Sequence, residues 1–97
     1  MQIATRADRI HAALSTAFSP TTLEVVDDSA QHAGHAGAQP GGETHYSVLL
    51  VARTLDGLGR VARYRAVHEV LAPEFAAGLH ALSLTLRTPE EHTQTTR

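Results

Sequence analysis

The segment that most constrains the fold is an alternating stretch near the C-terminus. After His80, leucine occupies every second position as far as Leu86, and small or polar residues fill the positions between. A period of two is typical of a β-strand with one buried face. That leucine face needs a layer of helix against it. His80 lies on the same face at the first position of the expected strand, so we expect its imidazole at the rim of the core, able to reach outward.

The N-terminal half predicts one helix and two strands. Thr5 is a suitable N-cap, and the apolar residues that follow have helical spacing until Ser19-Pro20. Residues 22–27 and 46–52 have strand patterns, and the second is apolar on both faces, as in a central strand. The Ala, Gly and His-rich segment between them, which runs to Gly42, is long for a hairpin loop, and such loops are usually functional or disordered.

A second helix is predicted over residues 60–71. Its apolar side includes Val61 and Tyr64, and its charged residues, Arg63 among them, are expected mostly on the opposite side. Pro73 is expected to kink or restart this helix. The leucine strand follows it directly.

The C-terminal segment begins with a helix signal. Thr88 and Glu91 have the spacing of a capping box, which opens one or two helical turns. We expect a single domain over residues 1–97, with an ordered core over residues 5–91 and a frayed tail over residues 92–97.

The element order predicts an α+β fold, α-β-β-α-β-(α). The first two strands follow each other directly, so they are expected to pair antiparallel, whereas the third is reached through a helix and is expected to be parallel to its neighbour. The result is a three-stranded mixed sheet with both main helices on one face.

Composition excludes several function classes. The chain of 97 residues has no Cys, so it has no thiolate chemistry of its own, and its net charge of −2 is not the footprint of a nucleic-acid-binding protein. No apolar run approaches the roughly 20 residues of a membrane span, and no signal pattern is present, so we expect a cytoplasmic protein without membrane contact. No nucleophile–base set or phosphate loop is found, and we expect no enzymatic activity.

Histidine is the unusual component. The chain has seven, and His32, His35 and His45 fall close together between the first two expected strands. Imidazole nitrogen is a common metal ligand, so these residues and His80 are candidates. From the residues alone, a packed rim histidine and solvated loop histidines explain the same positions.

Four stretches in this order resemble the BolA family, from about Arg9 to Glu91: EVVDDS at 24–29, PGGETHY at 40–46, RYRAVH at 63–68 and LHALSL at 79–84. The resemblance implies a fold close to the class II KH domain. It also implies a non-enzymatic adaptor that binds a monothiol glutaredoxin and shares a bridging 2Fe–2S cluster with it, in cluster trafficking or in iron or redox regulation.

The resemblance also implies the ligands. His80 matches the C-terminal histidine of the family, and His32 matches the loop ligand. The loop is longer here than is usual in the family, which makes His35 an alternative, although position favours His32. His45 is expected to be structural or to support a ligand. The partner side is expected to supply a cysteine and glutathione, and the free protein is expected to be a monomer.

The alternative function is a KH-like transcriptional regulator that binds nucleic acid. Its candidate contacts are Arg60, Arg63 and Arg65 on the second helix. KH domains clamp the nucleic-acid backbone with a Gly-x-x-Gly loop, and residues 57–59 have the wrong spacing for one. Fold alone does not decide between the two functions.

Overall fold

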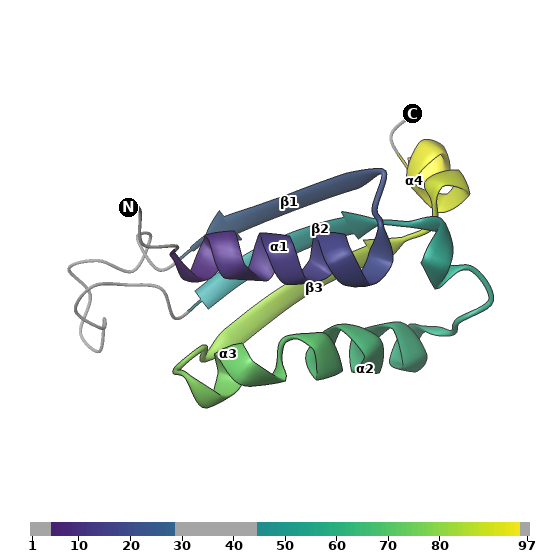
Figure 1. The fold of residues 1–97 in the computed structure, drawn as a ribbon. Coiled ribbons are helices and arrows are strands. Elements are labelled where there is room, and N and C mark those ends of the chain that lie inside the picture. The colour runs from purple at the N-terminus through teal and green to yellow at the C-terminus, as the bar shows by residue number, and fades with distance from the viewer. Residues whose placement is uncertain (1–4, 29–44, 96–97) are drawn as a thin grey trace.

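The computed structural model describes residues 5–28 and 45–95 (Figure 1). In chain order, its elements are α1 (Arg6–Phe18), β1 (Thr22–Asp27), β2 (His45–Val51), the 3₁₀ helix η2 (Arg53–Leu55), α2 (Arg60–Val70), α3 (Ala72–Ala76), β3 (Ala81–Arg87) and α4 (Pro89–Thr95). The predicted α+β order is confirmed. The short α3 is the restarted helix expected at Pro73. None of the helices described has both the length and the apolar character needed to cross a membrane.

The three strands form one mixed sheet in the order β1-β2-β3. β1 pairs antiparallel with β2, and β3 pairs parallel with β2 in a register that aligns His45 with Ala81 and Val51 with Arg87. Both predicted pairings are confirmed. Because β2 and β3 are parallel and in this register, they begin side by side at one end of the sheet (Figure 1).

The core lies between one face of the sheet and the two long helices (Figure 1). β2 contributes Tyr46, Val48 and Leu50 to it, which are at most 2% exposed. The helices contribute Ile10, Leu14, Phe18, Val67 and Leu71. Three half-buried leucines of β3 pack against this cluster: Leu82, Leu84 and Leu86. The β3 residues between them are exposed as far as Thr85, as the alternation predicted.

The C-terminal helix is longer than predicted. The capping box is present, since the Thr88 N–H donates to Glu91 Oε1 (2.8 Å) and the Glu91 N–H donates to Thr88 Oγ1 (3.3 Å). The prediction of a frayed tail from residue 92 is wrong for residues 92–95. The capped first turn continues, as the His92 N–H donates to the Thr88 carbonyl (3.0 Å).

The predicted apolar side of the second helix is also wrong in part. α2 reaches the core through its C-terminal half, where Val67 is fully buried. In its N-terminal half, Val61 is 63% exposed and Tyr64 is 37% exposed. Arg63 takes the inward position there, with a side chain only 14% exposed. The reason is that this half of α2 lies beside the edge of β3, and a long side chain spans the space.

Candidate metal centre

His80 is held at the surface by the turn that precedes β3. Gly78 has a φ of +118°, a conformation that other residues rarely adopt, so this turn requires glycine. The next residue is fixed inward: the Leu79 N–H donates to the Glu74 carbonyl (2.9 Å), and its side chain is buried. His80 follows, exposed, immediately before β3. The expected exposure of His80 at the rim is confirmed, but the alternation does not extend to it, because β3 begins at Ala81 and the preceding turn buries Leu79 instead.

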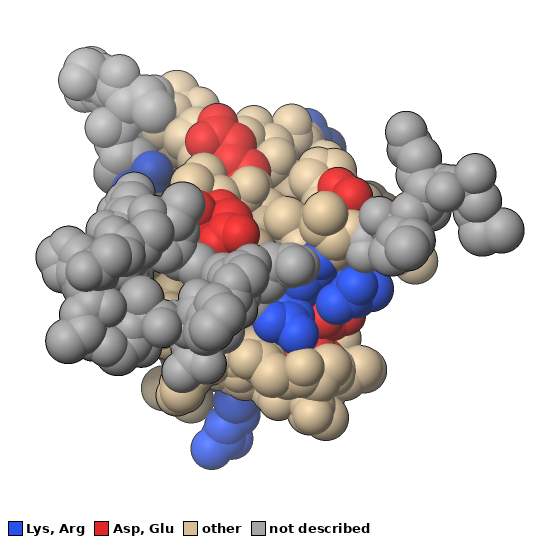
Figure 2. All heavy atoms as spheres, turned by 90° about the vertical axis from the view of Figure 1, so that its left-hand side faces the viewer, with Lys and Arg blue, Asp and Glu red and all other residues tan. Residues whose placement is uncertain are grey.

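Two arginines of α1 hold the same turn in place. Arg9 donates to Glu74 Oε2 through Nε (2.8 Å), and Arg6 donates to Glu74 Oε1 (3.3 Å) and to the Ala77 carbonyl (2.8 Å). The hydrogen bond from Arg9 is the main cause that lowers the pKa of the Glu74 carboxyl. Figure 2 looks onto this end of the molecule and shows basic and acidic side chains in contact there. The start of α1 is thereby fixed to the segment that presents His80.

His45 lies next to His80. It is the first residue of β2, paired in register with Ala81, and the two imidazole rings are stacked with centroids 5.8 Å apart and an interplanar angle of 11°. The His45 carbonyl accepts a hydrogen bond from the Asp28 N–H (2.8 Å). Asp28 and His45, which flank the segment 29–44, are therefore hydrogen-bonded to each other beside the His80 ring.

The sequence predicts a supporting role for His45 but not its place beside His80. A signal was available, because a parallel pairing of the two expected strands aligns their first residues. Sequence patterns leave the register of a parallel pair open, and a shift of one residue would direct His45 to the other face of the sheet.

The predicted loop ligands, His32 and His35, lie outside the described residues. Chain length alone sets how far each can reach from the ends of its segment. At no more than 3.6 Å a residue, His32 is within about 14 Å of Asp28. Asp28 donates a backbone hydrogen bond to His45, and the His45 ring stacks on His80. The length of chain therefore permits either loop histidine to approach His80.

The histidines described here can supply only part of a ligand set. Within residues 5–28 and 45–95, no group of three or more His, Cys, Asp or Glu side chains is arranged to hold a metal ion. A 2Fe–2S cluster takes four ligands, usually thiolates, and the chain has no Cys. The exposed imidazole of His80 fits a metal centre whose other ligands come from the loop and from a second molecule.

The arginines predicted for nucleic-acid contact differ in their environments. Arg63 donates through Nε to the Leu58 carbonyl (2.8 Å) and through its two terminal nitrogens to Glu91 (2.7 and 3.1 Å). It is therefore occupied within the protein, where it joins α2 to α4. Arg60 and Arg65 are exposed.

The contact between Arg63 and Glu91 predicts acid-dependent stability. The hydrogen bond from Arg63, followed by that from the Thr88 N–H, lowers the pKa of the Glu91 carboxyl from 4.5 to about 2. A carboxyl whose pKa is lower in the folded state stabilises the fold above its unfolded pKa and loses this effect as pH falls through the folded value. Glu91→Gln is therefore expected to lower the melting temperature at pH 7, and the difference from wild type is expected to shrink between pH 4.5 and about 2.

Thermal unfolding followed by circular dichroism at a series of pH values measures this effect. Glu90→Gln is the matched control, because it removes the same charge from the same helical turn without removing a partner of Arg63. An equal loss in both variants at pH 7, or a difference that does not depend on pH, would contradict the assignment.

Comparison with known proteins identifies similar sequences over nearly the whole chain. The sequence model of the family described as BolA-like protein matches residues 14–91. An uncharacterized Sinorhizobium protein, encoded in the region 5′ of cobS, is 44% identical over 91 residues, which cover 90% of this chain and 95% of the relative. The chloroplastic protein BOLA1 of Arabidopsis thaliana is 41% identical over 91 residues, which cover 92% of this chain and 57% of BOLA1.

Solved structures share the fold. BolA1 from Arabidopsis thaliana superposes with a TM-score of 0.82 at 40% identity, covering 93% of this chain and 98% of that structure. The BolA domain of SufE1 from the same plant gives a TM-score of 0.80 at 39% identity, covering 93% and 99%. The match to the full SufE-like protein 1 covers only 25% of that relative, so this chain is similar to one of its parts.

Proposed function

Because this chain belongs to the BolA-like protein family, we propose that it is a non-enzymatic adaptor that binds a monothiol glutaredoxin and provides histidine ligands to a 2Fe–2S cluster shared between the two proteins. The observation that carries the proposal is the exposed imidazole of His80, fixed at the start of β3 in a chain without Cys. A relative in which the BolA domain is part of a SufE-like protein favours an iron–sulfur setting.

The residues of this chain have separate tasks in the proposal. His80 supplies a ring nitrogen at a fixed place, because the Gly78 turn and the buried Leu79 side chain set its position. Stacking against His45 limits the orientations that the His80 ring adopts. His32, or His35 in its place, supplies the second nitrogen from the loop.

The partner completes the site. A glutaredoxin cysteine and glutathione supply the thiolates that this chain lacks. When bound, the cluster would have a reduction potential that two imidazole ligands raise above that of a centre ligated by thiolates alone. Exposure of His80 leaves one side of its ring accessible to that partner.

Mixing the protein with a cluster-loaded monothiol glutaredoxin and glutathione tests the choice of loop ligand. Visible absorption and circular dichroism are expected to change when the wild-type protein is added, since imidazole replaces ligands on iron. His32→Ala is expected to abolish the change, and His35→Ala is expected to retain it. The reverse pattern would assign the loop ligand to His35, and an unchanged spectrum with wild type would reject the adaptor function.

A further inference from the structure

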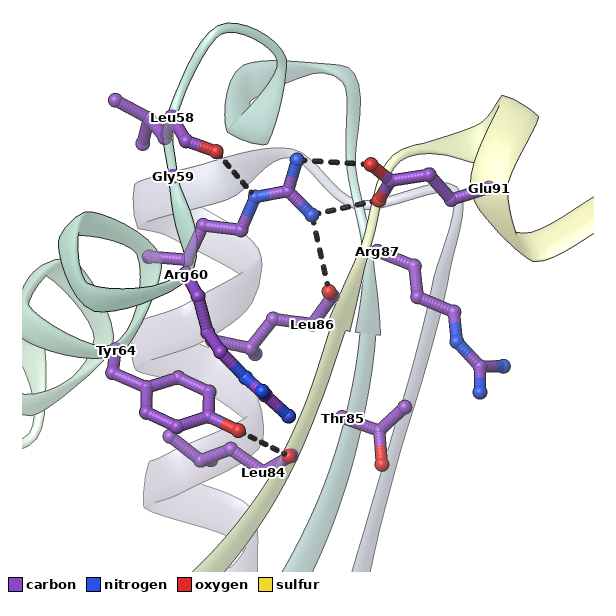
Figure 3. A pocket seen from close by; sticks show the side chains of 10 residues that line it. Leu58, Gly59, Arg60, Tyr64, Leu84, Thr85, Leu86, Arg87 and Glu91 are labelled. Atoms are coloured by element: carbon purple, nitrogen blue, oxygen red, sulfur yellow. Dashed lines mark hydrogen bonds and ion pairs between the residues drawn. The ribbon is translucent and has the colours of Figure 1, made fainter.

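A second surface lies at the other end of β3 from His80. It is a groove of about 610 Å³ between the N-terminal half of α2 and the C-terminal half of β3 (Figure 3). Its lining includes Leu58, Arg60, Arg63, Tyr64, Leu84 and Leu86. We call it the edge groove. The adaptor proposal assigns it no task.

One wall of the edge groove is the open edge of the sheet. The Ala52 N–H donates to the Arg87 carbonyl (3.0 Å), which shows that Arg87 directs its backbone groups inward along the sheet. Backbone groups alternate along a strand, so those of Leu84 and Leu86 point to the outer edge. In the part of the chain that the structure describes, β3 is the last strand of the sheet and no strand pairs with that edge.

Side chains of α2 cover this edge incompletely. Arg63 donates to the Leu86 carbonyl (3.2 Å). The Tyr64 hydroxyl lies 3.5 Å from the Leu84 carbonyl, at the outer limit of a hydrogen bond. Both contacts are made to carbonyls, and the Arg63 guanidinium has no acceptor atom for the outward-facing N–H groups of the two leucines, which the carbonyls of an added strand would accept from.

The other wall carries apolar surface and a cation. Leu58 and Tyr64, which line this wall, are 36% and 37% exposed. Figure 3 shows Arg60 extended beside Tyr64, with its guanidinium directed over β3 toward Leu84. Its guanidinium makes no ion pair or hydrogen bond within residues 5–28 and 45–95.

We propose that the edge groove binds an extended segment of a partner protein that adds a strand to β3 and places an acidic side chain against Arg60. Strand addition provides carbonyl acceptors for the outward N–H groups of Leu84 and Leu86, and side chains on one face of the segment cover Leu58 and meet Arg60. The segment displaces the weak contact of the Tyr64 hydroxyl.

A peptide fits this surface better than a nucleic acid. Backbone amide and carbonyl groups along a strand edge are matched by another peptide backbone, whereas phosphates need cations. Arg63 already has Glu91 as its partner, so the groove offers a row of phosphates less positive charge than Arg60 and Arg63 together would supply. The chain as a whole has a net charge of −2.

Titration of the full ¹⁵N-labelled chain with an extended peptide that carries valine and glutamate in turn at every second position, with threonine between them, tests the proposal, because valine and glutamate then lie on the same face of the added strand. The amide resonances of Leu84 and Leu86 are expected to shift in a saturable manner and to gain protection from hydrogen exchange. Arg60→Glu is expected to weaken binding about tenfold, because it reverses the charge that meets the acidic side chain. Arg65→Glu makes the same charge change on the same helix outside the groove and is expected to leave the affinity within about twofold.

Two further probes separate strand addition from attraction between charges alone. The same peptide with every backbone amide N-methylated keeps its charge but cannot form a ladder along either edge, so its binding is expected to be lost. Equal binding of the methylated peptide would overturn the proposal, as would the absence of shifts at Leu84 and Leu86. If a single-stranded DNA oligonucleotide shifts the amide resonances of Leu84 and Leu86 and the peptide does not, the groove would be assigned to nucleic acid.

Discussion

Replacing Leu50 with alanine is expected to lower the free energy of unfolding by about 2–5 kcal/mol. Leu50 is fully buried, lies on the central strand, and faces the layer formed by α1 and α2. Truncation removes apolar burial and leaves a cavity, because strands on both sides restrain the β2 backbone from moving inward. Domains of this size have total stabilities of about 5–15 kcal/mol, so the loss is a large part of the total.

Leu49→Ala provides a control on the same strand. Leu49 points to the opposite face of the sheet and is only half-buried. Its substitution is expected to lower the free energy of unfolding by less than half as much as that of Leu50. Urea denaturation of the two variants measures the difference, provided that the slope of the transition is unchanged. Equal losses would mean that the helices do not cover the face assigned to them here.

Removing the imidazole of His80 is expected to have the largest effect on function. In a mixture with cluster-loaded glutaredoxin and glutathione, His80→Ala is expected to abolish the change in visible circular dichroism that the wild-type protein produces. The reason is that the proposed centre needs a ring nitrogen from the start of β3 in addition to the one from the loop. Because His80 is exposed, the fold is expected to remain intact, and far-ultraviolet circular dichroism measures this.

His68→Ala is the matched control for that variant. His68 is also exposed, and its ring also stacks on another ring, that of Phe75, with centroids 5.1 Å apart. It lies on α2, so it tests whether the loss of any surface histidine disturbs the complex. The account expects a wild-type spectrum from His68→Ala, and equal loss in the two variants would refute a specific role of His80.

The fold was predictable because each element carries a local signal. The leucine alternation after His80, the helical stripe that contains Ile10, and the apolar run around Leu50 each fix an element and its buried face. The pairings of the strands then follow from how they are connected. The extension of α4 to Thr95 was not predicted, because its polar sequence has no apolar stripe and its stability depends on the cap at Thr88 and on the contact between Glu91 and Arg63.

The surroundings of the site were harder to predict, since they depend on how distant segments meet. The inward position of Arg63 requires the edge of β3 and a carboxylate of α4, and the helical period of α2 contains neither. In the same way, the stacking of His45 on His80 depends on the register of two strands far apart in the chain. A periodic pattern predicts the face of the helix or strand on which a residue lies, but not the distant residue that it contacts.

The central claim is that an imidazole nitrogen of this chain binds iron. Its most direct test is pulsed electron paramagnetic resonance of the one-electron-reduced complex between this chain, labelled with ¹⁵N-histidine, and an unlabelled, cluster-loaded monothiol glutaredoxin. The account predicts a strong ¹⁵N hyperfine coupling from directly bound nitrogen, absent with His80→Ala. A reduced cluster signal from the assembled complex without that coupling would contradict it.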